Sequence, residues 1–166
     1  ENVVGIKIVL TSFSVREKVG VEQTDYGIIV VTMDVSQSGI FVTSKAILPK
    51  VEVELTVMFG KYITASNISM ALLKDAISEI RASIEIVDSR VEGWNIPISD
   101  TIADNASGSH FLIGKEFKTL DEMDPSPAVR RLYKNGECCS EGTGKDGSQC
   151  SSVSSSSSCL DITSAT

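Results

Sequence analysis

The sequence predicts an α+β fold, in which an antiparallel β-meander of four or five strands is covered by one long amphipathic helix. Short stretches rich in β-branched residues, separated by polar turns, fill the first sixty positions and favour a meander. Residues 66–90 then place apolar side chains at steps of three and four, which is typical of a helix with one apolar side. A short second helix and a tail rich in Cys and Ser complete the predicted architecture.

Alternation of apolar and polar residues locates the strands. The expected strands cover residues 2–13, 26–35, 40–48, 51–58 and 110–117. Residues 26–35 are apolar on both faces, which favours a central position in the sheet. Residues 51–58 alternate more strictly and predict a strand with one buried face and one solvated face that carries Glu52 and Glu54.

Two helices are expected. The first lies within residues 66–90 and its apolar stripe is formed by Met70, Leu73, Ile77, Ile80, Ile84 and Val87. This helix covers one face of the sheet, and pairing with its copy in another subunit is the alternative. The second follows Ser126, with Pro127 at its first position and Asn135-Gly136 as its stop.

The composition changes abruptly at Gly136, where Ser begins to dominate. We therefore expect a core domain at residues 1–135 and a tail at residues 136–166. All four cysteines lie in this tail, namely Cys138, Cys139, Cys150 and Cys159. Because adjacent cysteines rarely bond to each other, either Cys138 or Cys139 pairs with Cys150 and the other pairs with Cys159. A zinc site is disfavoured by the adjacency of the first two, so no metal is predicted.

Several weak signals together indicate a secreted protein or one at a cell or virion surface. The chain begins with Glu rather than Met, which suggests a processed precursor or a trimmed chain. The even number of cysteines favours an oxidising compartment and disulfide bonds. Asn67 and Asn105 each begin an Asn-X-Ser sequon and are candidate glycosylation sites.

Charge and motif content exclude several functions. A net charge of −7 disfavours nucleic acid as a partner, and no apolar run reaches the roughly 18 residues that a transmembrane helix needs. The single histidine, His110, follows a Gly-Ser loop, and no nucleophile elbow or phosphate loop is present. The sequence therefore predicts no catalytic residue and no cofactor, and the protein is not expected to be an enzyme.

These observations favour a structural or assembly subunit that associates with itself as a filament, a shell or a surface layer. Exchange of the strand at residues 2–13 between subunits would use the apolar face formed by Val4, Ile6, Ile8 and Leu10. The alternative is a secreted ligand-binding or recognition domain, or less favoured a hydrolase. Its apolar pocket would lie near Trp94, with Phe59 and Tyr62 as further lining residues.

Overall fold

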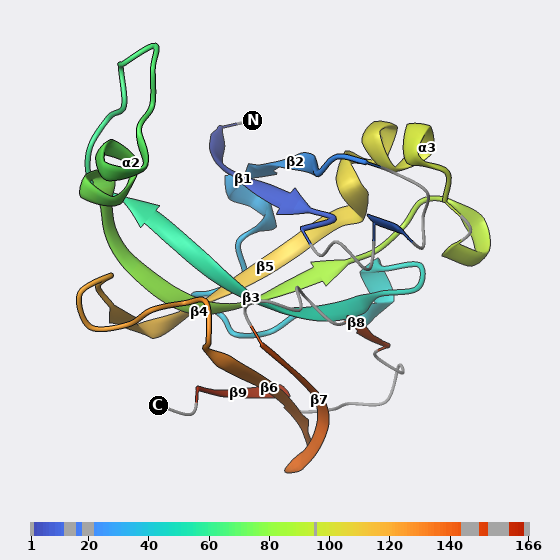
Figure 1. Cartoon of the computed structure of the whole chain (residues 1–166). Helices are drawn as coiled ribbons and strands as arrows, with labels where there is room; N and C mark the ends of the chain where they lie inside the picture. Colours follow the sequence, from blue (N-terminus) through green and yellow to red (C-terminus); the bar gives the residue numbers. More distant parts are fainter. Residues whose placement is uncertain are drawn as a thin grey trace.

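The computed structural model describes residues 2–11, 16–17, 22–94, 96–143, 150–152 and 160–164. In this part of the chain, most regular structure is β-sheet (Figure 1). The strands are β1 (Val3–Val9), β2 (Asp25–Val30), β3 (Lys50–Phe59), β4 (Ile77–Val87), β5 (Gly108–Lys118), β6 (Val129–Lys134), β7 (Glu137–Thr143), β8 (Cys150–Ser152) and β9 (Leu160–Ser164). The helices are α2 (Met70–Ala76) and α3 (Ile98–Ala103), and four 3₁₀ turns are η1 (Val31–Met33), η2 (Thr43–Lys45), η3 (Glu92–Trp94) and η4 (Asn105–Ser107).

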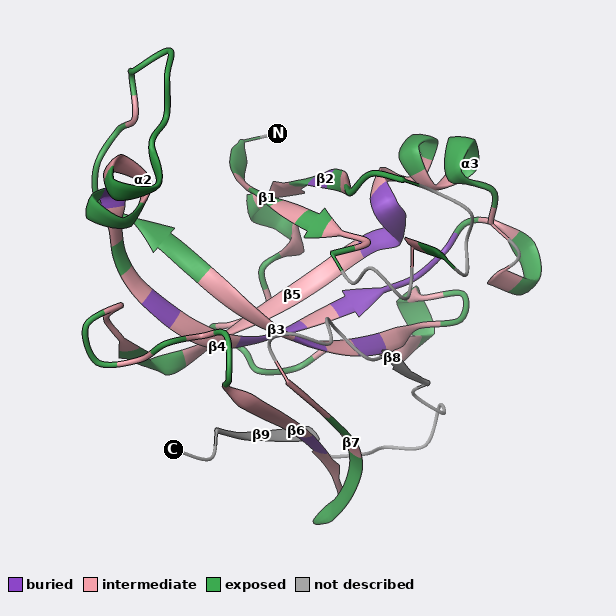
Figure 2. Cartoon of the chain, viewed as in Figure 1, coloured by how far each residue is buried: buried purple, intermediate pink, exposed green. Residues whose placement is uncertain are grey.

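Three antiparallel sheets form layers. The central sheet has the strand order β5-β4-β3-β8, a pair of strands β1-β2 lies on one side of it, and the sheet β7-β6-β9 lies on the other (Figure 1). Buried residues concentrate in the central sheet (Figure 2). The core cluster lies between this sheet and β6 and consists of Val51, Val53, Ile84, Ile86 and Leu132. The predicted α+β meander beneath a long helix is therefore wrong.

The long helix expected at residues 66–90 is replaced by α2 and the eleven-residue strand β4. The Ser69 side chain caps α2 by accepting a hydrogen bond from the Leu72 N–H at 3.2 Å. β4 pairs along both edges, with β3 and with β5, so its backbone groups are satisfied by two neighbours. Its sequence also alternates, with Ile80, Ile84 and Ile86 buried on one face. β-branched residues at that period favour a strand, and pairing with the neighbouring strands β3 and β5 stabilises it.

The second predicted helix is also a strand. Residues 129–134 form β6, which returns as β7 through the two-residue turn Asn135-Gly136. Both turn residues have positive φ, 54° at Asn135 and 83° at Gly136, as a tight hairpin of this kind requires. The Asn-Gly pair therefore marks a hairpin rather than the end of a helix.

The remaining predicted strands have mixed outcomes. β3 and β5 match the strands predicted at residues 51–58 and 110–117. β2 ends at Val30 and lies in the two-stranded sheet, so it is not central. Residues 40–48 contain η2 but no strand, because the N–H groups of Ile47 and Leu48 bond to the Asp88 carboxylate instead of to a neighbouring strand.

The expected domain boundary after residue 135 falls within the turn between β6 and β7. Beyond it, the backbone of β8 pairs with β3 and that of β9 pairs with β6. The division into two domains stays a prediction. Consistent with the sequence, the described residues contain no helix with the length and apolar character needed to cross a membrane.

Candidate functional site

Three carboxylates share one face of the central sheet. Glu52 and Glu54 are two residues apart on β3, so their side chains point to the same side. Glu85 is the register partner of Glu52 on β4 and joins them on this face. Like charges placed opposite each other across two strands repel, so this face needs a counter-charge.

Lys7 supplies a positive charge from β1. In this strand Lys7 alternates with Val4, Ile6 and Ile8, whose side chains are more than half exposed, and its own side chain is only 9% exposed. The Lys7 ammonium forms an ion pair with Glu85 and donates a hydrogen bond to the Ala106 carbonyl at 2.8 Å. A charge buried in this way is stable because it is paired and hydrogen-bonded.

The carbonyl that receives Lys7 belongs to a strained turn. Asn105, Ala106 and Ser107 all have left-handed φ values, 53°, 51° and 54°, which non-glycine residues seldom adopt. The Asn105 side chain holds the turn against β2, since it accepts from the Ile28 N–H at 2.6 Å and donates to the Ile28 carbonyl at 2.9 Å. Strain of this kind persists only where the surroundings enforce it, and such positions cluster at functional sites.

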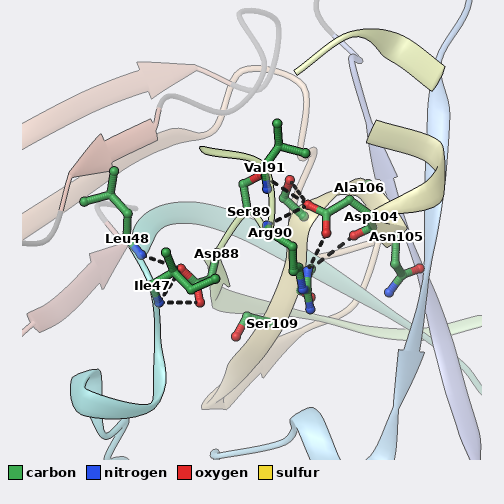
Figure 3. A network of polar contacts seen from close by, with 12 residues as sticks. Ile47, Leu48, Asp88, Ser89, Arg90, Val91, Asp104, Asn105, Ala106 and Ser109 are labelled. Carbon is green, nitrogen blue, oxygen red and sulfur yellow. Dashed lines mark hydrogen bonds and ion pairs between the residues drawn. The ribbon is translucent and has the colours of Figure 1, made fainter. Parts of the chain in front are cut away.

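A polar network around Asp104 fixes the same turn (Figure 3). The Asp104 side chain is 7% exposed and forms an ion pair with Arg90 at 3.3 Å. It also accepts hydrogen bonds from the Ser107 hydroxyl at 2.8 Å and from the Ser89 hydroxyl at 3.3 Å. The network therefore ties the turn that holds Lys7 to the segment that follows β4.

An open cavity of about 240 Å³ lies beside Lys7 and the left-handed turn. Its wall includes Lys7, Glu52, Glu54 and Trp94 together with apolar residues, and the remaining lining residues are Ile8, Val9, Leu10, Thr11, Val87, Ile96, Thr101, Ala106 and Ser107. Trp94 is fixed by its indole N–H, which donates to the Leu48 carbonyl at 3.1 Å, and by Lys50, whose ammonium lies 3.7 Å from the ring centre.

The pocket predicted near Trp94 thus exists, but charged groups line part of it. Phe59 and Tyr62 do not line it, since they are 55% and 101% exposed elsewhere on the surface.

Glu54 has an unusual charge state for a carboxyl group. Its pKa is raised to about 7. Burial is the main cause, and the negative charges of Glu52 and Glu85 act in the same direction. Arg130 and Lys7 act in the opposite direction. A carboxyl group with a pKa near neutrality can both hold and release a proton under physiological conditions, as general acid–base catalysis requires.

Among the residues that the structure describes, no three His, Cys, Asp or Glu side chains gather closely enough to form a metal site as they stand. His110 lies away from the cavity wall. Its ring nitrogen Nδ1 shares a hydrogen bond with the Ser109 hydroxyl at 2.8 Å, and its ring packs on Phe41. Burial lowers the pKa of His110.

Cys138 and Cys139 lie outside the cavity wall. Cys138 and Cys139 are on β7, exposed and free, so no disulfide is found at either of them. The backbone of Cys150 begins β8, and Cys159 lies outside the described residues. The proposed pairing among the four stays a prediction.

The two sequons differ in their surroundings. Asn67 is exposed ahead of α2, and its glycosylation stays a prediction. The Asn105 amide nitrogen is already bonded to β2, so a glycan there would break the contact that holds the left-handed turn.

The predicted assembly strand pairs within its own chain, as β1 with β2. Val4, Ile6 and Ile8 remain exposed on its outer face, and Leu10 follows the strand with a positive φ of 58°. Exchange of this strand between subunits stays a prediction.

Sequence reasoning missed the charged residues of the site. The Val-Glu alternation of residues 51–58 was interpreted as a solvated face, although Glu52 and Glu54 are only partly exposed. A single Lys inside an apolar strand was the available signal, because a lysine on the inward face of a strand needs an acidic partner.

Comparison with known proteins shows what the chain is similar to. No family model matches it. It is 38% identical over 142 residues to 2-keto-4-pentenoate hydratase 2 of Dechloromonas aromatica (strain RCB), covering 86% of this chain and 54% of that protein. It is 34% identical over 146 residues to the 2-hydroxypent-2,4-dienoate hydratase of Pseudomonas putida, covering 87% of this chain and 65% of the relative.

Among solved structures, the chain resembles 4-oxalocrotonate decarboxylase from Pseudomonas putida G7 complexed with magnesium and adipate. The TM-score is 0.80 and the sequence identity is 31%, over 86% of this chain and 54% of that one.

These findings correct the functional predictions. The non-enzymatic structural or assembly subunit is wrong, because the relatives are hydratases and a decarboxylase and therefore enzymes. The secreted or surface-exposed filament protein is wrong for the same reason. The signals behind it were individually weak, and the N-terminal strand places Lys7 in an ion pair with Glu85.

The chain spans about half the length of the first relatives that it matches. The similarity in sequence to the hydratase and in fold to the decarboxylase each covers 86% of this chain.

Proposed function

We propose that this chain contributes the substrate- and cation-binding cavity of a hydratase that acts on a short unsaturated 2-keto acid. The main observation behind this proposal is the cavity. Its wall includes the buried ammonium of Lys7 and the carboxyl group of Glu54, whose pKa is about 7. The similarity to 2-keto-4-pentenoate hydratase 2 supplies the substrate class.

The donor groups suit a divalent cation such as the magnesium named with the related decarboxylase. Mg²⁺ prefers oxygen ligands and keeps several waters, so one or two carboxylates are enough to hold it. Glu52 and Glu54 reach the cavity, and Glu85 lies beside Glu52, where mutual repulsion already penalises the charged form of Glu54. Glu52 and Glu54 would therefore hold the ion, which would supply positive charge for the oxygens of a 2-keto acid.

The chain's own residues would perform the remaining tasks. Hydration adds a hydroxyl group and a proton across a carbon–carbon double bond, so the site must bind the acid and orient it. Lys7, fixed by Glu85 and the Ala106 carbonyl, offers a positive charge to the substrate's carboxylate. The apolar wall formed by residues such as Val87 and Ile96 limits water around the substrate.

The test begins with binding, because it does not depend on a complete catalytic apparatus. Calorimetric titration with Mg²⁺ is expected to show saturable binding that is lost in Glu52→Gln and weakened in Glu54→Gln. Glu116→Gln, an exposed carboxylate on β5, is the matched control and should bind as the parent protein does. Unchanged binding in both cavity variants would overturn the cation assignment.

Activity is then followed by NMR in D₂O with 2-keto-4-pentenoate and Mg²⁺. A hydratase gives a hydroxylated product with deuterium on carbon, and Glu54→Gln should lose on the order of 10²-fold or more of the rate, because a ligand of the cation is lost. Release of CO₂ from 4-oxalocrotonate without hydration would favour decarboxylation, which the structural similarity supports as the second candidate. Full activity of Glu54→Gln would contradict the cation assignment.

Self-association of the chain also stays a proposal. It is supported by the exposed apolar side chains that β1 and β2 share on their outer face, namely Val4, Ile6, Ile8, Tyr26 and Ile28. Sedimentation velocity over a range of concentrations would test it, and a concentration-independent monomer would refute it.

A further inference from the structure

Trp94 brings an aromatic ring to the cavity wall from a strained turn. Gly93 and Trp94 both have positive φ values, 70° and 60°. A bulky residue seldom adopts this conformation, which persists only where the surrounding structure enforces it. The contacts of the Trp94 side chain enforce it here, and they also decide where the ring lies.

The indole N–H fixes one edge of the ring. It donates to the Leu48 carbonyl at 3.1 Å. The Leu48 N–H in turn donates to the Asp88 carboxylate at 2.7 Å, and the Ile47 N–H donates to the same group at 2.9 Å (Figure 3). Asp88 is 7% exposed and directly follows Val87, which lines the cavity. A buried carboxylate at the end of β4 therefore holds the segment to which the ring is bonded.

Lys50 places the ring relative to the carboxylates of the cavity. Its ammonium lies 3.7 Å from the centre of the Trp94 ring, which is a cation–π contact. Lys50, Glu52 and Glu54 follow one another at steps of two on β3, so their side chains point to the same side of the sheet. Two residues of a strand span roughly 7 Å, so a short acid bound at Glu52 can reach the ring.

The cavity wall has a charged part and an apolar part. The charged part, with Lys7, Glu52 and Glu54, suits the oxygens of a 2-keto acid and the cation that would bind them. A carbon tail placed against these groups would remove water from them without replacing its hydrogen bonds. Val87 and Trp94 offer apolar surface instead, and the indole ring is the larger and more rigid of the two.

We propose that Trp94 is a specificity-determining residue, whose fixed indole ring packs against the carbon tail of a short 2-keto acid. This inference rests on the proposed function, which supplies the class of acid. It adds where the tail lies, and it gives Asp88 a role as a positioning residue that acts through the segment bonded to the indole N–H.

Saturated 2-keto acids test the tail contact without turnover, because they have no double bond to hydrate. Calorimetry in the presence of Mg²⁺ compares pyruvate with 2-ketopentanoate, which is longer by two methylene groups. The parent protein is expected to bind 2-ketopentanoate on the order of tenfold more tightly, since these groups leave water. Trp94→Ala should lose most of this difference and keep its affinity for pyruvate. Tyr62→Ala, which removes an exposed aromatic ring outside the wall, is the matched control and should keep both.

Fluorescence follows the ring itself and does not require a variant that folds. The sequence contains one tryptophan, so the emission of the protein reports Trp94. At equal saturation, 2-ketopentanoate should change the emission of the parent protein more than pyruvate does. Asp88→Asn replaces one acceptor oxygen of the carboxylate with a donor, so the emission anisotropy and the difference between the two acids should both fall.

Equal emission changes with the two acids in the parent protein would overturn the inference. So would an undiminished difference between the acids in folded Trp94→Ala, or an equal loss of affinity for both acids, which a purely structural role produces. If the difference depends on Trp94 as expected but Glu52→Gln binds Mg²⁺ as the parent protein does, the proposed cation site fails while the tail contact stands.

Discussion

At the scale of single residues, one carboxyl group shows how strongly burial and neighbouring charges act in the cavity. Glu54 is 31% exposed on its side chain, shares its face with Glu52 and Glu85, and has a pKa of about 7 instead of the ordinary 4.5. A nearby ammonium and a guanidinium keep the pKa from rising further. Environment rather than residue type therefore separates Glu54 from the exposed glutamates of the chain.

The raised pKa of Glu54 also predicts how stability depends on pH. Between about 4.5 and about 7 the folded protein binds more protons at this group than the unfolded chain does, so the free energy of unfolding falls as pH rises through that window. Allowing for solvent screening, the Glu54 contribution is on the order of 1–2 kcal/mol. Urea denaturation at several pH values should show this loss in the parent protein and in Glu116→Gln, and a much smaller one in Glu54→Gln. An equal slope in all three proteins would contradict the raised pKa.

At the scale of elements, the left-handed turn η4 is the part that joins β1 and β2 to the site. Its Asn105 bonds to the backbone of β2, and its Ala106 carbonyl receives Lys7 from β1. The close approach of η4 to β2 depends on Gly27, where a Cβ atom would lie 2.8 Å from the Asn105 carbonyl and 3.1 Å from the Lys7 side chain. The glycine is therefore a packing requirement of the site.

Substitution of Gly27 by alanine tests this requirement. Because backbone must move to admit the methyl group, Gly27→Ala is expected to lower the free energy of unfolding by about 1–3 kcal/mol and to weaken binding of the 2-keto acid by displacing Lys7. Gly5→Ala on β1 is the matched control, since its Cβ would find its nearest neighbour at 4.0 Å. Denaturant unfolding and calorimetry measure both effects, and equal behaviour of the two variants would show that η4 does not depend on this contact.

At the scale of the whole molecule, the sheet β7-β6-β9 covers the core face of the central sheet. Leu132 is 1% exposed and packs with Val51, Val53, Ile84 and Ile86, so apolar burial holds the two sheets together. The same contact brings Arg130 to the edge of β3. The opposite face of the central sheet is left to the charged cavity and to β1.

Removal of the Leu132 side chain should therefore weaken the attachment of the second sheet. Leu132→Ala is expected to cost about 2–5 kcal/mol in the free energy of unfolding, since it leaves a cavity between two layers. Ile40→Ala, at a position that is 67% exposed, should cost far less. Urea denaturation compares them, and a small effect for Leu132→Ala would mean that β6 contributes little to the core.

Local periodicity by itself determined part of this protein. The strands at residues 51–58 and 110–117 were predictable because a strand with one buried face repeats every two residues, and β3 and β5 lie there. The Cys- and Ser-rich composition also marked where the character of the chain changes. In contrast, residues 77–87 satisfy both a helical and a strand period, and only the neighbours β3 and β5 decided between them.

The site was decided by tertiary structure alone. Lys7 and Glu85 are 78 positions apart, and Asn105 and Ile28, like Arg130 and Val53, are 77 apart. Local patterns report which face of an element is apolar, but not which distant strand will face it. The charges of Lys7, Glu52 and Glu54 therefore interact strongly only after the sheets stack, because stacking removes the water that would otherwise screen them.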